Sequence, residues 1–169
     1  MEKSHRFPAG NRRDALFGGI VLLVIAADQL TKWWIKSNLQ IGQSFFDIGF
    51  FRIIRIYNTG AAFGIFKDHS RVFIVAAIIG IIVVLSLVIY LRGRWYFIDN
   101  LLVRSSIGLI LGGISGNLID RLVDNGRVTD FIDFKVWPAF NVADASSVVG
   151  TIILAYCILF KLKPAGQEG

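Results

Sequence analysis

The sequence predicts an all-α membrane protein, in which a four-transmembrane-helix bundle carries a small extracytoplasmic β-sheet and an interfacial loop. Of the 169 residues, 54% are hydrophobic and 18% are charged, whereas about a quarter of the residues of a typical soluble domain are charged. Four stretches approach the roughly 20 apolar residues that are needed to cross a bilayer. The length suits one domain, so residues 1–169 are expected to form a single membrane domain.

The four predicted spans cover residues 15–35, 72–91, 101–119 and 142–160. The second span carries no charged side chain, and the first and fourth carry Asp28 and Asp144 close to one end. Asp130 and Asp144 lie at the edges of hydrophobic segments. A carboxylate is costly at a membrane boundary, which makes these two aspartates candidates for function.

Four spans place both termini on the same side of the membrane. Basic residues in short flanking segments mark the cytoplasmic side, and they are denser in the terminal segments than in the segments on the other side. We therefore expect both termini in the cytoplasm. The net charge of +6 then fits contact with anionic lipid of the inner leaflet. It fits nucleic acid less well, because the basic residues are scattered and form no binding module.

Two segments are expected outside the membrane, residues 36–71 and residues 121–141. In the first, residues 45–57 are rich in Phe and Ile, which favours strands, and we expect a small sheet that lies on the membrane surface. The second begins with the turn signal Asp124-Asn125-Gly126. Apolar and aromatic residues follow and predict an interfacial loop, in which Asp133 is expected as a solvated carboxylate.

The polar residues of the spans gather at the outer end of the predicted bundle. Asp28 and Lys32 are four residues apart, so they share one helix face. Similar spacings occur near the end of the third span and at the start of the fourth. The whole set comprises Asp28, Lys32, Asn117, Asp120, Arg121, Asn141 and Asp144. Membrane anchoring alone does not require these side chains at one depth.

A stripe of glycines supports a packed bundle. Gly108, Gly112 and Gly116 recur every four residues along the third span, and Asp120 extends the stripe by one more step. Small residues at this spacing let a neighbouring helix approach closely. The polar cluster is therefore expected at the end of a close helix–helix contact.

Simpler interpretations exist for several of these residues. Asp28 with Lys32, or Asp120 with Arg121, could be an ion pair that ends a helix at the headgroups. Asn141 has the spacing of an N-cap for a helix with Asp144 at its third position. Asp124 is expected to be a turn residue. The occurrence of all these groups at one interface favours a functional site over these separate explanations.

The remaining residue types narrow the chemistry. No span contains a histidine to activate a serine, and the single cysteine, Cys157, lies deep in the fourth span. A His-Glu-x-x-His zinc motif and a Gly-rich phosphate loop are both absent from the sequence. Among hydrolytic mechanisms this leaves two carboxylates that activate water and share one proton. The candidates are Asp130 and Asp144.

The positions of the two aspartates predict which of them holds the shared proton. Asp144 lies in the first turn of the fourth span, where free backbone N–H groups favour a charged carboxylate. Asp130 lies in an apolar loop, where loss of water favours the neutral acid. We expect the proton on Asp130.

Two other functions are compatible with intramembrane acids. A small membrane transporter or proton pathway is the main alternative, because such proteins also carry acids within their spans. A scaffold or interaction protein is a third possibility. Acids that gather at one end of the bundle, and the lack of an inverted repeat, favour a hydrolytic site over a transporter.

Five blocks of this sequence resemble the lipoprotein signal peptidase family, the type II signal peptidases of bacteria. In family order they are Asp28-Gln29-Leu30-Thr31-Lys32, Asn58-Thr59-Gly60-Ala61-Ala62-Phe63, Gly112-Gly113-Ile114-Ser115-Gly116-Asn117-Leu118-Ile119-Asp120-Arg121, Val128-Thr129-Asp130-Phe131 and Phe140-Asn141-Val142-Ala143-Asp144. The pair Ile114-Ser115 departs from the family, which more often has Ala and an aliphatic residue there. We expect this departure to alter helix packing and not the polar cluster.

The resemblance implies an intramembrane aspartyl endopeptidase of the bacterial inner membrane, with its active site at the outer face. Its substrates would be prolipoproteins whose cysteine already carries diacylglycerol, cleaved just before that cysteine. Membrane lipid would be a partner, globomycin-like lipopeptides would inhibit, and no metal or organic cofactor is expected. Asp130 and Asp144 would be the catalytic pair. The residues that would bind substrate or support the site are Asn58, Gly60, Asn117, Arg121, Asn141, Asp28, Lys32 and Asp120.

Overall fold

The computed structural model describes residues 9–59, 70–91 and 100–161. Its helices are α1 (Ala9–Asn38), α2 (Ser70–Leu91), α3 (Leu101–Val123) and α4 (Val142–Lys161). Its strands are β1 (Ser44–Asp47), β2 (Arg52–Asn58) and β3 (Val128–Asp133). Each helix contains a segment that is long and apolar enough to cross a membrane, as the sequence predicted.

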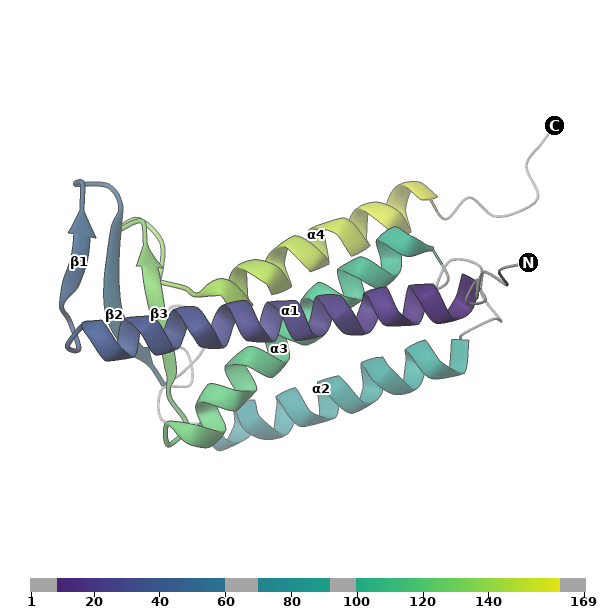
Figure 1. Cartoon of the computed structure of the whole chain (residues 1–169), viewed down its shortest axis with the longest axis horizontal. Helices are drawn as coiled ribbons and strands as arrows, with labels where there is room; N and C mark the ends of the chain where they lie inside the picture. The colour runs from purple at the N-terminus through teal and green to yellow at the C-terminus, as the bar shows by residue number, and fades with distance from the viewer. Residues whose placement is uncertain (1–8, 60–69, 92–99, 162–169) are drawn as a thin grey trace, which may run out of the picture.

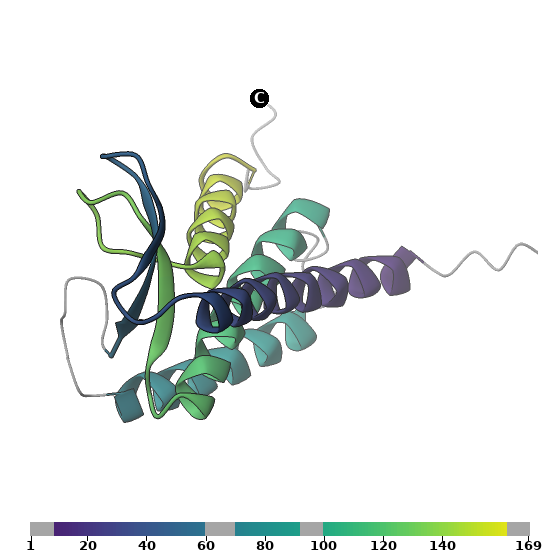
Figure 2. The same ribbon diagram turned by 60° about the vertical axis from the view of Figure 1, so that its left-hand side comes forward.

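The helices run side by side, and the sheet lies at one end of the bundle with its strands across the helix axes (Figure 1). α3 is the central helix, since it packs against α1, α2 and α4. α2 packs mainly against α3 and exposes most of its apolar side chains. α1 begins and α4 ends at the end of the bundle opposite the sheet (Figures 1 and 2).

The glycine stripe of α3 forms the contact with α1, as the sequence predicted. A Cβ atom at Gly112 would lie 2.7 Å from Cβ of Val24, and one at Gly116 would lie 2.6 Å from Oδ2 of Asp28. Two glycines outside this stripe lie in the contact between α3 and α4: a Cβ atom at Gly113 of α3 would meet Ser147, and one at Gly150 of α4 would meet the carbonyl oxygen of Ser106. Because glycine has no side chain, these positions let α1 and α4 pack closely against α3.

α1 and α3 run past the ends predicted for the first and third spans, to Asn38 and Val123. Lys32 and Asp28 are 1% and 0% exposed and therefore lie inside the helix bundle. The interpretation of this pair as the end of a helix is wrong. Both helices continue because their charged side chains find partners on each other instead of in the headgroups.

The turn after α3 forms as expected, with Asp124 as the helix C-cap. Asn125 and Gly126 have φ angles of 54° and 85°, and the Gly126 amide donates to the carbonyl oxygen of Arg121 at 2.8 Å. A Cβ atom at Gly126 would lie 2.4 Å from Cβ of Ser70. Glycine is required here both by its positive φ and by the approach of the first residue of α2.

The three strands form one antiparallel sheet in the order β1-β2-β3. Strand β2 lies in the segment predicted to form strands, but β3 lies in the segment that was predicted to be a loop. Asp130 is therefore a strand residue opposite Ile56. The sheet is held to the bundle by Phe131, which packs against Ile35 and Leu39 at the end of α1.

The expectation that Asp133 is a solvated carboxylate is wrong. Asp133 is 5% exposed, and its Oδ2 atom accepts a hydrogen bond from Nε of Arg52 at 2.6 Å. Arg52 and Asp133 are register partners on β2 and β3. The sequence spacing did not reveal this ion pair, because it depends on the pairing of two strands that are far apart in the chain.

We predict that Gly112→Ala destabilises the bundle by about 1–3 kcal/mol, because the added methyl group must displace Val24 or α1 itself. Gly80→Ala is the matched control, since a Cβ atom at Gly80 would have no neighbour within 4 Å and alanine favours helix. Thermal unfolding in detergent measures both variants. Equal Tm values for the two would contradict the close contact at Gly112.

Candidate active site

The candidate site lies at the end of the bundle that carries the sheet. There the C-terminal ends of α1 and α3 and the start of α4 meet strand β3. The structure brings together the predicted residues Asp28, Lys32, Asn58, Asn117, Asp120, Asp130, Asn141 and Asp144 in one hydrogen-bonded network. Arg121 lies at its edge. Gly60, which was also predicted, falls outside the described residues.

Lys32 is the centre of the buried network. Its ammonium group lies 2.7 Å from Oδ2 of Asp28, 3.2 Å from Oδ2 of Asp120 and 2.9 Å from Oδ1 of Asn117. Lys32 is 1% exposed, and both aspartates are at most 2% exposed. A buried lysine requires such compensation, because an unpaired ammonium out of water costs several kcal/mol.

Asp28 and Asp120 each connect Lys32 to another element. Oδ1 of Asp28 accepts a hydrogen bond from the amide of Ala143, in the first turn of α4, at 3.0 Å. Oδ2 of Asp120 accepts one from the amide of Thr129, on β3, at 3.0 Å. The two carboxylates therefore set the positions of the residues that directly precede Asp144 and Asp130.

Asn141 and Asp144 form a reciprocal cap at the start of α4. The amide of Asp144 donates to Oδ1 of Asn141 at 3.0 Å, and the amide of Asn141 donates to Oδ2 of Asp144 at 3.2 Å. The capping interpretation of this pair is confirmed. It does not exclude a role in the site, because Nδ2 of Asn117 donates to the other oxygen of Asp144 at 2.7 Å.

Asn141 also contacts the second candidate aspartate. Its Nδ2 atom donates to Oδ1 of Asp130 at 2.7 Å, and Nδ2 of Asn58 donates to Oδ2 of Asp130 at 3.0 Å. One residue, Asn141, thus makes hydrogen bonds to the carboxylates of both Asp130 and Asp144. The sequence predicted that these two acids act as a pair. In the structure both accept hydrogen bonds from the same residue, Asn141.

Asp130 is 2% exposed, and burial, together with the charge of Asp144, raises its pKa to about 7. Hydrogen bonds from Asn58 and Asn141 and the charge of Lys32 act in the opposite direction but do not outweigh burial. A pKa near 7 lets Asp130 hold a proton at neutral pH, as the apolar surroundings of this residue predicted.

Arg121 is half-buried beside the two acids. It makes one long hydrogen bond, 3.5 Å from Nη1 to the carbonyl oxygen of Asn117, and its Cζ atom lies 5.2 Å from the centre of the Phe73 ring. Arg121 forms no ion pair with a carboxylate of the described residues. The simpler interpretation, an ion pair between Asp120 and Arg121, is therefore wrong, and Asp120 pairs with Lys32.

Three further residues belong to the network and were not singled out from the sequence. Nε2 of Gln29 donates to Oδ2 of Asp28 at 3.1 Å and to the carbonyl oxygen of Gly116 at 3.1 Å. Lys36 pairs with Asp124 and lies 3.5 Å from Oδ1 of Asp120. Thr129 contributes its backbone only. The sequence could have indicated Lys36, because it follows Lys32 by one helical turn and so lies on the same helix face.

The four buried or half-buried acids of the site do not form a metal centre. Within residues 9–59, 70–91 and 100–161, no group of three His, Cys, Asp or Glu side chains could hold a metal ion. Their oxygens are instead occupied by Lys32, by asparagine amides and by backbone N–H groups. The arrangement can hold one proton on Asp130 and leave Asp144 to act on water.

We predict that Asp130→Asn stabilises the protein, and more so at pH 8 than at pH 5. Burial and the charge of Asp144 raise the pKa of Asp130 in the folded protein to about 7, well above that of an aspartate in water, so the native state loses stability as the pH rises toward this value. We expect a gain of at least ~1 kcal/mol at pH 8, or about 2–4 °C in Tm for a chain of this size.

Asp47→Asn is the control for this titration. Asp47 is exposed, and its hydrogen bond from Lys135 lowers its pKa, so it titrates below this pH window. Thermal unfolding of the wild type and both variants at the two pH values makes the comparison. A gain from Asp130→Asn that is equal at pH 5 and pH 8 would contradict a raised pKa at Asp130.

Comparisons with known proteins identify the family of this chain. The family model for signal peptidase (SPase) II matches residues 20–160. A lipoprotein signal peptidase of Moorella thermoacetica is 42% identical over 151 residues, which cover 89% of this chain and 95% of the relative. One of Bacillus velezensis is 40% identical over 146 residues, which cover 83% and 92%.

A solved structure of a bacterial membrane enzyme has a similar fold. It is described as a bacterial membrane enzyme determined by the in meso method at 2.3 Å resolution, and it matches with a TM-score of 0.76 at 32% identity over 92% of this chain and 94% of its own. These matches favour a peptidase over the alternative of a small transporter. Since the family model extends from the first span through the fourth, this chain belongs to the signal peptidase II family.

Proposed function

We propose that this protein is an aspartyl endopeptidase that removes the signal peptide from lipoprotein precursors, with Asp130 and Asp144 as its catalytic pair. The observation that carries the proposal is Asn141, which makes hydrogen bonds to both carboxylates. Family membership supports the peptidase activity and the class of substrate. The identity of the pair rests on burial, on the raised pKa of Asp130 and on these contacts.

In the proposed mechanism the two aspartates have opposite roles: Asp144 starts as the base and Asp130 as the acid. The Asp144 carboxylate takes a proton from a water molecule, and the resulting hydroxide attacks the scissile carbonyl carbon. Asp130 donates its proton toward the carbonyl oxygen, which becomes the hydroxyl of a tetrahedral intermediate. Asp144 then gives its proton to the leaving nitrogen, and Asp130 recovers its proton as the carbonyl forms again. The peptide bond breaks, one water is consumed and both acids return to their starting states.

The neighbouring amides keep this asymmetry in place. Lys32 and Asn141 both donate to Oδ1 of Asn117, at 2.9 and 3.0 Å, so the Nδ2 of Asn117 must face Asp144. Asp144 therefore receives donors on both oxygens, from Asn117 and from the amide of Asn141. These two donors hold the Asp144 carboxylate in one orientation.

We further propose that the site lies at the outer face of the bacterial inner membrane, with both chain termini in the cytoplasm. Apolar side chains exposed around the sheet support this depth. They include Phe45, Phe46, Ile48, Phe50, Val136 and Trp137, with Val136 92% and Trp137 60% exposed. Aromatic side chains in such positions are typical of the headgroup region. A substrate cut there would be one whose scissile bond is held at the membrane surface.

The substrate class that fits this depth is a prolipoprotein whose cysteine carries diacylglycerol. The lipid would hold the scissile bond, just before the cysteine, at the depth of Asp130 and Asp144, which supplies the proximity part of catalysis. A globomycin-like lipopeptide would compete for the same place. Incubation of purified protein in detergent with a diacylglyceryl prolipoprotein tests the activity directly.

We predict that Asp130→Asn and Asp144→Asn each lower kcat by at least ~10³-fold, because each removes one of the two proton transfers. Asp47→Asn, an exposed aspartate of β1, should cleave like the wild type. Mass spectrometry of the products measures cleavage, and thermal unfolding verifies that each variant is folded. A folded Asp130→Asn or Asp144→Asn variant with near-normal turnover would rule out this catalytic pair.

We predict that the same precursor without its diacylglyceryl group is cleaved at least ~10²-fold more slowly, measured as kcat/KM in mixed micelles. The reason is that the lipid fixes the position of the scissile bond, and good positioning contributes several powers of ten to a rate. A precursor in which the lipid is attached to a cysteine three residues further along is the control. Equal rates for all three substrates would show that the lipid is incidental.

A further inference from the structure

Arg121 is held beside the candidate pair by an aromatic ring instead of a carboxylate. Its Cζ atom lies 5.2 Å from the centre of the ring of Phe73, which belongs to α2. Arg55 and Arg127 also lie over a ring, that of Tyr57, whereas Arg52 and Arg104 take the carboxylates of Asp133 and Asp14 as partners. Arg121 does not, although Asp144, Asp130 and Asp120 are near enough to act on its charge.

This difference has a chemical consequence. A carboxylate that paired with Arg121 would occupy two of its N–H donors and neutralise its charge. A ring under the flat face of the guanidinium stabilises the cation but leaves the N–H groups at its edge free. The one hydrogen bond that Arg121 makes, to the carbonyl oxygen of Asn117, is 3.5 Å long and therefore weak. Arg121 thus keeps donors available next to Asp130 and Asp144.

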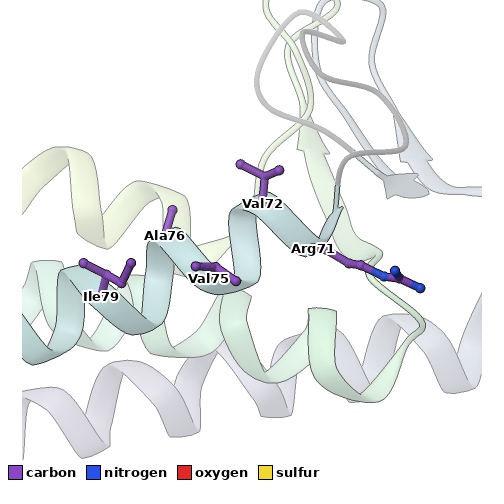
Figure 3. Close-up of a pocket in the computed structure, with 5 residues that line it drawn as sticks. All are labelled: Arg71, Val72, Val75, Ala76 and Ile79. Carbon is purple, nitrogen blue, oxygen red and sulfur yellow. The ribbon is translucent and has the colours of Figure 1, made fainter.

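The position of Phe73 on α2 separates it from the membrane-facing side of that helix. Val72, Val75, Ala76 and Ile79 line an apolar groove at the outer end of α2, and Arg71 points away from these four side chains (Figure 3). These positions follow the i, i+3, i+4, i+7 spacing of one helix face. Phe73 lies off that stripe, on the side that reaches Arg121 of α3.

We propose that Phe73 is a positioning residue, which holds the Arg121 guanidinium beside Asp130 and Asp144 with its donors free to bind a peptide carbonyl oxygen of the substrate. This inference rests on the proposed peptidase function and adds a role for α2, which supplies none of the residues of the buried network. Arg121 touches the substrate, and Phe73 acts through Arg121. Without the ring, Arg121 would turn toward the nearest carboxylate, where its donors would be occupied.

Cleavage kinetics on a diacylglyceryl prolipoprotein test the role of the ring. Phe73→Leu should lower kcat/KM by about three- to thirtyfold, which corresponds to ~0.7–2 kcal/mol and lies in the range of a cation–π interaction. Phe73→Tyr keeps the ring and should retain activity within about twofold of the wild type. Ile79→Leu, on the membrane-facing stripe of α2, is the control and should have no effect. Equal losses for Phe73→Leu and Phe73→Tyr would overturn the proposal.

A double-mutant cycle separates positioning from packing. In an Arg121→Gln background, Phe73→Leu should cause no further loss, because the residue through which Phe73 acts is gone. A loss as large as in the wild-type background would mean that Phe73 serves only to pack α2 against α3, and would overturn the proposal. Thermal unfolding of each variant checks that the four proteins are folded.

A measurement without substrate tests the contact between Phe73 and Arg121 independently of the peptidase activity. In micelles, ¹⁵N-labelled arginine should give an Arg121 side-chain NMR signal that is shifted by the ring current of Phe73 and that moves in Phe73→Leu. An Arg121 signal unchanged by Phe73→Leu would overturn the inference whatever the protein cleaves. No cleavage by the wild type, with the signal shifted as expected, would instead refute the proposed function and leave the ring contact standing.

Discussion

The buried ammonium group of Lys32 is the interaction on which the outer half of this protein depends. It lies within 3.2 Å of Asp28, Asp120 and Asn117, which come from α1 and α3. Two carboxylates and one ammonium that are buried in a helix bundle are stable only if each is paired. The remaining oxygens of the two aspartates therefore bind backbone amides at the start of α4 and on β3. Through these bonds one cation holds the sheet and three helices in a single arrangement.

The same contacts serve stability and chemistry at the start of α4. Asn141 and Asp144 cap the helix, and this cap is also the part of the site that carries one candidate catalytic carboxylate. Because the cap uses one oxygen of Asp144 and Asn117 uses the other, Asp144 is oriented before any substrate arrives. Preorganised donors of this kind cost no rearrangement during the reaction. Asp130 reaches the same place from a strand, and burial raises its pKa to about 7.

The helices differ in what they contribute. α3 supplies Asn117, Asp120 and Arg121 and packs against the other three, whereas α2 is apolar and packs mainly against α3. Glycines on α3 allow α1 to approach so closely that Asp28 reaches the amide of Ala143. Close packing by small residues is the usual way for membrane helices to associate, since lipid competes for apolar contacts. In this bundle the polar contacts therefore depend on the close helix packing.

The sequence by itself determined the four spans, the close contact along the glycine stripe and the place of the polar cluster. These depend on local hydropathy and on spacing along one helix, which a single segment reveals. Tertiary structure alone decided that residues 128–133 form a strand, that Asp133 pairs with Arg52 and that Asp120 pairs with Lys32 instead of Arg121. Each of these depends on contacts between residues at least 70 positions apart. No local pattern carries that information, because which partner a buried charge finds is set by how the helices and strands pack together.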